Sequence, residues 1–157
     1  MSDASSDTSG VGFPPPLLYA GGFAAGYAAH RLLPVRVWPE GTVASTLGWG
    51  LIVAGVLLAV SAAYLFRRAG TSPNPAQPTV ALVIWGPYRF TRNPMYVGMT
   101  ILYAGGTVLL NDPWPLAFLP VVLALVRRRV IAREEDYLER KFGDEYRAYK
   151  ARVRRWI

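Results

Sequence analysis

The chain has 157 residues, of which 52% are hydrophobic and 17% are charged. Soluble domains carry about 25% charged residues, so this composition favours a single-domain membrane protein. The sequence has no cysteine and one histidine, which excludes disulfides, cysteine nucleophiles and a Cys/His zinc site, and we expect no metal. The net charge is +7. Because the basic residues adjoin apolar segments and form no recognisable nucleic-acid-binding motif, we expect no nucleic acid as a partner.

The first thirteen residues, MSDASSDTSGVGF, are mostly Ser, Asp, Gly and Thr and have little apolar surface to bury. We therefore expect residues 1–13 to be disordered. They also lack the positively charged start of a signal peptide, so the apolar stretch that follows is expected to be a retained helix. A single membrane domain would then cover residues 14–157.

Four apolar stretches predict an all-α integral membrane protein with about four transmembrane helices. Their approximate ranges are 16–33, 48–66, 95–110 and 114–126. The second stretch is the clearest, because its 19 residues carry no charge and are followed by two arginines. The third and fourth are short for a full crossing and are joined by an Asn-Asp-Pro turn, which predicts a short helical hairpin.

Small residues recur in the first stretch, with Gly22 and Gly26 four residues apart. This spacing is typical of membrane helices whose backbones approach a neighbouring helix closely. Glycine is also common in membrane helices without such a contact, and the spacing alone leaves both interpretations open.

A cytoplasmic helical region is predicted beyond the fourth stretch, over residues 127–153. Its first part has apolar residues at spacings of seven and four, as in an amphipathic helix, and Gly143 is a natural stop before a last short helix. With four crossings, the side that holds both termini carries fifteen Lys and Arg residues, whereas the other side carries two. The positive-inside rule therefore predicts a multi-pass protein with both termini in the cytoplasm.

Polar residues gather at the expected cytoplasmic mouth of the third helix, in the segment WGPYRFTRNPMYVG (85–98). Pro94 suits the first turn of a helix, and the free N–H groups of that turn attract anions. Arg92 beside it could clamp a carboxylate. The alternative is that Arg92 is an ordinary positive-inside residue and that Tyr96 is an interfacial anchor.

A pair of carboxylates, Glu134 and Glu135, follows the end of the fourth stretch by one to two helical turns. Carboxylates close to a bilayer are costly unless they are paired or solvated, and they can mark a functional site. The alternative is that they form weak surface ion pairs with the nearby arginines at 127–129.

Three ordered blocks, at 86–98, 109–114 and 133–153, resemble the integral-membrane methyltransferases that include isoprenylcysteine carboxyl methyltransferase and phosphatidylethanolamine N-methyltransferase. The resemblance covers roughly the C-terminal half of the chain, from about Val80. The Asn-Pro-Met-Tyr-x-Gly run at 93–98 is closer to the phospholipid enzymes, whereas the tail is closer to the isoprenylcysteine branch. The resemblance therefore leaves the acceptor open among an isoprenylcysteine-like carboxylate, a phospholipid amine and a small thiol.

The resemblance implies S-adenosylmethionine as methyl donor and a hydrophobic, membrane-accessible acceptor. The residues it implies for cofactor binding are Gly86, Pro87, Tyr88, Arg92, Asn93, Pro94, Tyr96, Gly98, Glu134 and Glu135. Those expected to take part in catalysis are Arg92, Glu134 and Glu135; which glutamate acts as a base, and the oligomeric state, stay open.

Two other function classes compete with the methyltransferase interpretation. Sterol reductases carry a related Arg-x-Pro-x-Tyr-x-Gly block and bind NAD(P)H, but they are generally much longer than this chain. A non-enzymatic membrane protein could use the basic tail, with eleven Lys and Arg after Val126, to bind anionic lipid. The tandem glutamates favour the methyltransferase.

Overall fold

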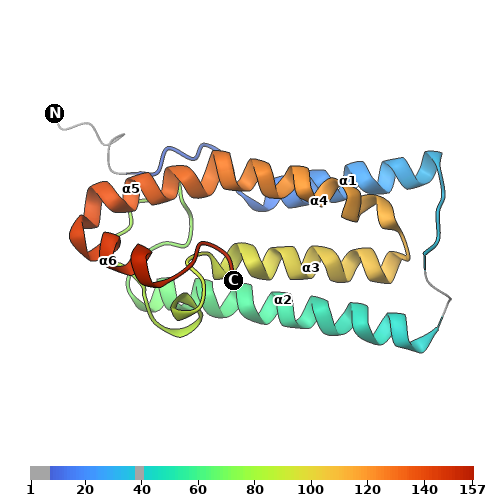
Figure 1. Cartoon of the computed structure of the whole chain (residues 1–157), viewed down its shortest axis with the longest axis horizontal. Helices are drawn as coiled ribbons and strands as arrows, with labels where there is room; N and C mark the ends of the chain where they lie inside the picture. The colour runs from blue at the N-terminus through green and yellow to red at the C-terminus, as the bar shows by residue number, and fades with distance from the viewer. Residues whose placement is uncertain (1–7, 38–40) are drawn as a thin grey trace.

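A computed structural model describes residues 8–37 and 41–157, and every regular element within those ranges is helical (Figure 1). The elements are α1 (Pro16–Leu32), α2 (Thr42–Arg68), η1 (Gly86–Arg89), α3 (Pro94–Leu110), α4 (Pro113–Leu125), η2 (Val126–Ile131), α5 (Ala132–Phe142) and α6 (Asp144–Arg152). The all-α class is thus confirmed. Helices α1 to α4 run side by side along the long axis, and α5 and α6 lie at one end.

The helix boundaries follow the apolar stretches of the sequence closely, except that α2 begins at Thr42, six residues before the predicted start. Polar Thr and Ser at the start of α2 extend the helix beyond its apolar part. Among the described helices, α2 alone is long and apolar enough to cross a membrane by itself, whereas α3 is apolar but shorter.

Helices α2 and α3 are antiparallel and approach each other through glycines. A Cβ atom added to Gly98 would lie 2.7 Å from the carbonyl oxygen of Gly55, and one added to Gly55 would lie 2.6 Å from the carbonyl oxygen of Gly98. Two turns away along α3, a Cβ atom added to Gly105 would lie 2.8 Å from the carbonyl oxygen of Gly48. A side chain would keep the two backbones from approaching this closely, so these glycines set the distance between the helices.

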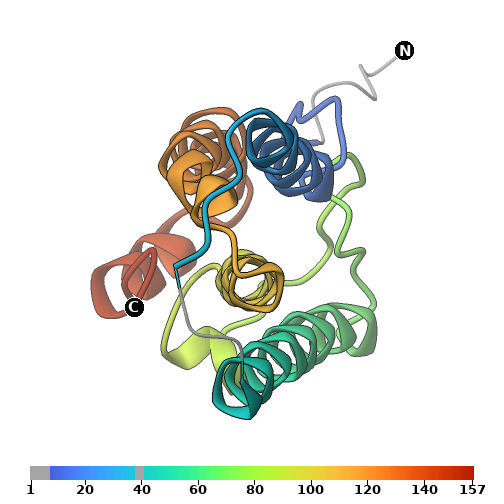
Figure 2. The same cartoon turned by 90° about the vertical axis from the view of Figure 1, so that its right-hand side faces the viewer.

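Helix α1 packs on α4, on the other side of α3 from α2, as the view along the bundle shows (Figure 2). A Cβ atom on Gly26 would overlap the backbone of Pro115, and one on Gly22 would overlap the side chain of Val122. Of the two interpretations that the glycine spacing leaves open, the close approach to another helix is the one present, and the partner helix is α4.

The turn between α3 and α4 is short. Asn111 takes the left-handed conformation, with φ of 49°, and Asp112 caps α4 by accepting a hydrogen bond of 3.0 Å from the backbone N–H of Trp114. Helix α4 then continues without a break through the π-helical turn η2 into α5. The fourth apolar helix and the predicted amphipathic helix thus form one rod, which brings α5 to the end of the bundle.

Residues 8–13, at the start of the described chain, lie against the loop after α2 and against α5. The hydroxyl of Ser9 donates a hydrogen bond of 2.6 Å to the carbonyl of Pro75, and Arg133 donates one of 2.9 Å to the carbonyl of Gly10. Val11 is 2% exposed. The composition predicts disorder over 1–13; residues 1–7 lie outside the described residues, and from Ser9 onward the side chains of Val11 and Phe13 and two side-chain-to-backbone hydrogen bonds hold the segment in place.

Candidate functional site

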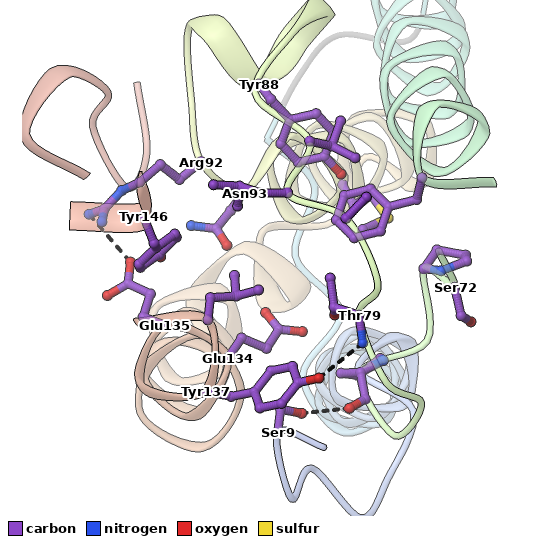
Figure 3. Close-up of a pocket in the computed structure, with 18 of the residues that line it drawn as sticks. Ser9, Ser72, Thr79, Tyr88, Arg92, Asn93, Glu134, Glu135, Tyr137 and Tyr146 are labelled. Atoms are coloured by element: carbon purple, nitrogen blue, oxygen red, sulfur yellow. Dashed lines mark hydrogen bonds and ion pairs between the residues drawn. The ribbon is translucent and has the colours of Figure 1, made fainter. Parts of the chain in front are cut away.

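A cavity lies at the end of the bundle where α3 begins and where α5 and α6 fold back over it (Figure 3). The empty space between its walls, with the open mouth included, is about 780 Å³. Its lining comes from seven parts of the chain: Ser9; Phe66; Ser72, Pro73, Asn74, Pro75, Thr79, Ala81, Leu82 and Val83; Tyr88; Arg92, Asn93, Met95 and Tyr96; Glu134, Glu135, Tyr137 and Leu138; and Tyr146 and Tyr149.

Six of the residues implied by the sequence line this cavity together: Tyr88, Arg92, Asn93, Tyr96, Glu134 and Glu135. They come from η1, from the turn before α3, from the first turn of α3 and from α5, and their separation along the chain reaches 47 residues. The structure therefore brings the two polar blocks of the sequence into one wall.

Four other implied residues shape the site without lining it. Gly86 takes a φ of +62°, which lets the chain turn into η1, followed by Pro87. Pro94 is fully buried at the first position of α3, where its missing N–H costs nothing. Gly98 faces Gly55 and Ala59 of α2, so its contact is with the neighbouring helix.

Glu135 is the most strongly paired carboxylate of the site, and it is 5% exposed. Its Oε1 accepts a hydrogen bond of 3.0 Å from Nε of Arg155, and its Oε2 accepts a second from Nη2 of the same guanidinium. Nη2 of Arg92 lies 3.3 Å from Oε1. Glu135 is therefore a buried member of a two-arginine cluster, and the alternative of a weak surface pair does not describe it.

Glu134 lies on the same turn of α5 in a different environment. Its Oε1 accepts a hydrogen bond of 2.8 Å from the hydroxyl of Tyr96. Burial raises the pKa of the Glu134 carboxyl to about 7; the hydrogen bond from Tyr96 opposes this rise, and the charge of Glu135 adds to it. At neutral pH, Glu134 is thus poised between its two protonation states, as a group that accepts or releases protons must be.

Two buried groups in the cavity wall have no hydrogen-bond partner within the described ranges. They are the Nε and Nη1 atoms of Arg92 and the hydroxyl of Tyr88. Burial raises the pKa of Tyr88 well above its ordinary value, so the hydroxyl stays protonated. Buried donors without partners are costly, and at a concave site they indicate a position where a ligand supplies the acceptor.

The last residues of the chain, 153–157, pass beside the Arg92 turn and are called here the C-terminal strap. The backbone N–H of Arg92 donates a hydrogen bond of 2.9 Å to the carbonyl of Arg154. The carbonyl of Arg155 accepts 2.8 Å from Nδ2 of Asn93 and 3.1 Å from the hydroxyl of Thr91. The strap thus holds the turn from which Arg92 and Asn93 enter the site.

Sequence reasoning missed the aromatic side of the cavity and the strap. Tyr137 on α5 lies three residues after Glu134, and Tyr146 and Tyr149 of α6 are also three apart, so helical spacing could have grouped them. The hydroxyl of Tyr149 donates 2.7 Å to the carbonyl of Tyr88 and so joins α6 to η1. No comparable signal marks Arg155, because its position depends on the chain reversing after α6.

The described residues contain no cluster of three or more His, Cys, Asp or Glu side chains that could hold a metal ion. The polar groups of the cavity are an arginine, two asparagines, two carboxyls, several tyrosines and the hydroxyls of two serines and a threonine. Such a set can bind a small molecule that carries both a carboxylate and cationic or hydroxyl groups.

Comparison with known proteins identifies the family of the chain. The phospholipid methyltransferase family model matches residues 43–145, which include α2, η1, α3, α4 and both glutamates of α5. An uncharacterised protein of Haemophilus influenzae is 45% identical over 65 residues, which are 40% of this chain and 100% of that protein. The chain belongs to the phospholipid methyltransferase family, within the superfamily of membrane methyltransferases that the three sequence blocks resemble.

Proposed function

We propose that the protein transfers a methyl group from S-adenosylmethionine to an acceptor that reaches the site from the membrane. The observation that carries this proposal is the gathering of Arg92, Tyr96, Glu134 and Glu135 in one cavity, with the unpartnered donors of Arg92 in its wall. Family membership supports methyl transfer, and the resemblance implies the donor.

The residues fit the polar groups of this donor. Its carboxylate suits the free Nε and Nη1 of Arg92, since a guanidinium and a carboxylate form paired, charge-assisted hydrogen bonds. Its ammonium or hydroxyl groups suit the carboxyl of Glu134, and the hydroxyl of Tyr88 is a further donor. When bound, S-adenosylmethionine supplies an electrophilic methyl group for in-line displacement.

The protein would act mainly by aligning the two reactants and excluding water. A carboxylate or thiolate acceptor is already a nucleophile and needs no base. An amine acceptor must lose a proton, and Glu134, whose pKa is about 7, can take it at neutral pH. The role of Glu134 therefore depends on the acceptor, whereas the role of Arg92 does not.

We further propose that α1 to α4 all cross the membrane, with both termini in the cytoplasm. The end of the bundle that carries the cavity also carries most of the Lys and Arg residues, including the eleven that follow Val126. The shorter helices α3 and α4 would be accommodated by local thinning of the bilayer. Phe66, Leu82 and Met95 give the cavity an apolar part that suits a hydrophobic acceptor.

The first test is calorimetric titration of the detergent-purified protein with S-adenosylmethionine, its demethylated product and NADPH. Glu134→Gln is measured beside Glu145→Gln, which removes an exposed carboxylate just beyond α5. Binding of the first two ligands, weakened in the Glu134 variant and unchanged in the Glu145 variant, supports the proposal. Binding of NADPH alone supports a reductase, and binding of none by the folded protein supports a non-enzymatic role.

The acceptor is then sought by transfer of a labelled methyl group to three substrates: phosphatidylethanolamine in vesicles, a farnesylated cysteine derivative, and a small thiol. Glu134→Gln separates the classes. Transfer to the amine should fall strongly, because the proton acceptor is lost. Transfer to the carboxylate, and to the thiol at a pH where it is ionised, should fall only as far as cofactor binding does.

A further inference from the structure

The guanidinium of Arg155 joins the C-terminal strap to α5 at the edge of the cavity. It donates hydrogen bonds to both carboxylate oxygens of Glu135, from Nε to Oε1 at 3.0 Å and from Nη2 to Oε2. The backbone carbonyl of the same residue accepts hydrogen bonds from Asn93 and Thr91. Arg155 therefore binds the turn before α3 with its backbone and α5 with its side chain.

Arg92 approaches the same carboxylate much less closely. One nitrogen, Nη2, lies 3.3 Å from Oε1, whereas Nε and Nη1 are buried without a partner among the described residues. A carboxylate that pairs with a single guanidinium usually forms two parallel hydrogen bonds with it. Glu135 does so with Arg155 and not with Arg92.

We propose that Arg155 is a positioning residue that keeps Glu135 occupied and so leaves the guanidinium of Arg92 available to an anionic group of the ligand. In the proposed function, on which this inference rests, that group is the carboxylate of S-adenosylmethionine. Without Arg155, Glu135 pairs fully with Arg92 and competes with the ligand.

The charges of the cluster lead to the same conclusion. Arg92 and Arg155 share the single carboxylate of Glu135, so the donors of Arg92 that Glu135 does not use stay open to an anion. Removing Arg155 leaves one guanidinium and one carboxylate, which neutralise each other. The anion then has to break a buried pair before it can bind.

The test uses Arg155→Ala, Arg155→Lys and Arg155→Ala combined with Glu135→Gln. Arg152→Ala is the control, because it removes the same charge from an exposed position at the end of α6. Binding of S-adenosylmethionine and of its demethylated product is measured by calorimetry on the full chain. We expect Arg155→Ala to weaken binding about tenfold, the value of a charged hydrogen bond, and Arg155→Lys to restore part of it.

The decisive comparison is made in the Glu135→Gln background. A glutamine cannot hold Arg92 as a carboxylate does, so adding Arg155→Ala to Glu135→Gln should change binding by less than about twofold. A residue that only stabilises the fold would weaken binding equally in both backgrounds. An equal effect, or no effect of Arg155→Ala on the wild type, would overturn the inference.

A second measurement does not depend on ligand binding. The ¹⁵N–¹H signal of Nε in Arg92 is followed without ligand in the wild type, in Arg155→Ala and in the double variant, and is assigned by its loss in Arg92→Lys. The signal should move in Arg155→Ala, as Glu135 binds Arg92, and return in the double variant. If the wild type binds no S-adenosylmethionine but this shift occurs, the proposed function fails and the positioning role stands. If the signal does not shift in Arg155→Ala, the positioning role itself is overturned.

Discussion

The hydroxyl of Tyr96 donates a hydrogen bond of 2.8 Å to Glu134 and so joins the first turn of α3 to α5 across 38 residues of sequence. Each partner comes from a different polar block of the sequence. The bond also acts on the protonation of Glu134, since it favours the charged form against the effect of burial.

Replacing Tyr96 by Phe should therefore raise the pKa of Glu134 above its value of about 7, because the charged carboxylate loses a donor. The pH at which an amine acceptor is methylated at half the maximal rate should move upward by the same amount. The pH profile of kcat/KM checks this. Tyr103→Phe, which removes a hydroxyl bound to the carbonyl of Pro115 at 2.7 Å, should leave the profile where it is.

The raised pKa of Glu134 also makes stability depend on pH. The unfolded carboxyl has a pKa near 4.5 and the folded one about 7, so between these values the folded state holds more protons. The contribution of Glu134 to the free energy of unfolding is fully present below about pH 4.5 and is lost as the pH rises through about 7. Thermal unfolding of Glu134→Gln and of the wild type should diverge over this range, with the variant more stable at pH 8. A constant difference would contradict the assignment.

Gly98→Ala should destabilise the fold, because the new methyl group would meet the carbonyl of Gly55 and the backbone of Ala59. We expect a loss of about 1–3 kcal/mol, as for other overpacked contacts. Gly50→Ala, at a position of α2 with open space around it, should be neutral or slightly stabilising. Thermal unfolding checks both. Affinity for S-adenosylmethionine, measured where Gly98→Ala is still folded, should stay close to that of the wild type; a large loss there would assign Gly98 a direct contact.

Asn93→Asp should loosen the C-terminal strap. The amide of Asn93 donates to the carbonyl of Arg155, and a carboxylate would instead face that oxygen without a proton to share. We expect the free energy of unfolding to fall by about 1–3 kcal/mol and cofactor binding to weaken with it. Asn93→His keeps a nitrogen donor and should retain more of both, as denaturant unfolding and calorimetry can establish. Equal losses in the two variants would show that the donor is not what matters.

The helices are predictable from the sequence because long apolar runs and their Pro, Gly and Asn boundaries are local signals. The turn at Asn111 and the stop at Gly143, which has a φ of +54°, are examples. The position of Val11 is not predictable in this way. Val11 and Phe13 are too few to show a periodicity, and their burial depends on a core built by distant helices.

The residues of the candidate site also separate into those that the sequence predicts and those that only the fold reveals. Arg92, Tyr96 and the two glutamates stand in compact motifs, the family resemblance of those motifs implies a shared site, and the structure brings the four residues together. Gly98 belongs to the same motif as Arg92 and Tyr96, yet it contacts α2. A sequence motif gives the type of residue at a position and does not tell which part of the fold that residue contacts. Arg155 lies in no motif, and only the folded chain shows that it reaches Glu135.

The wall of the cavity includes Ser9, near one end of the described chain, and the strap that holds Arg92 and Asn93 in that wall lies near the other end. During synthesis, the turn that carries Arg92 and the helix that carries Glu134 are complete before Arg155 is added. A growing chain therefore cannot form the finished site until the strap has been synthesised and Arg155 can reach Glu135. A ligand that depends on the full set of contacts would stabilise completed molecules in preference to partly made ones.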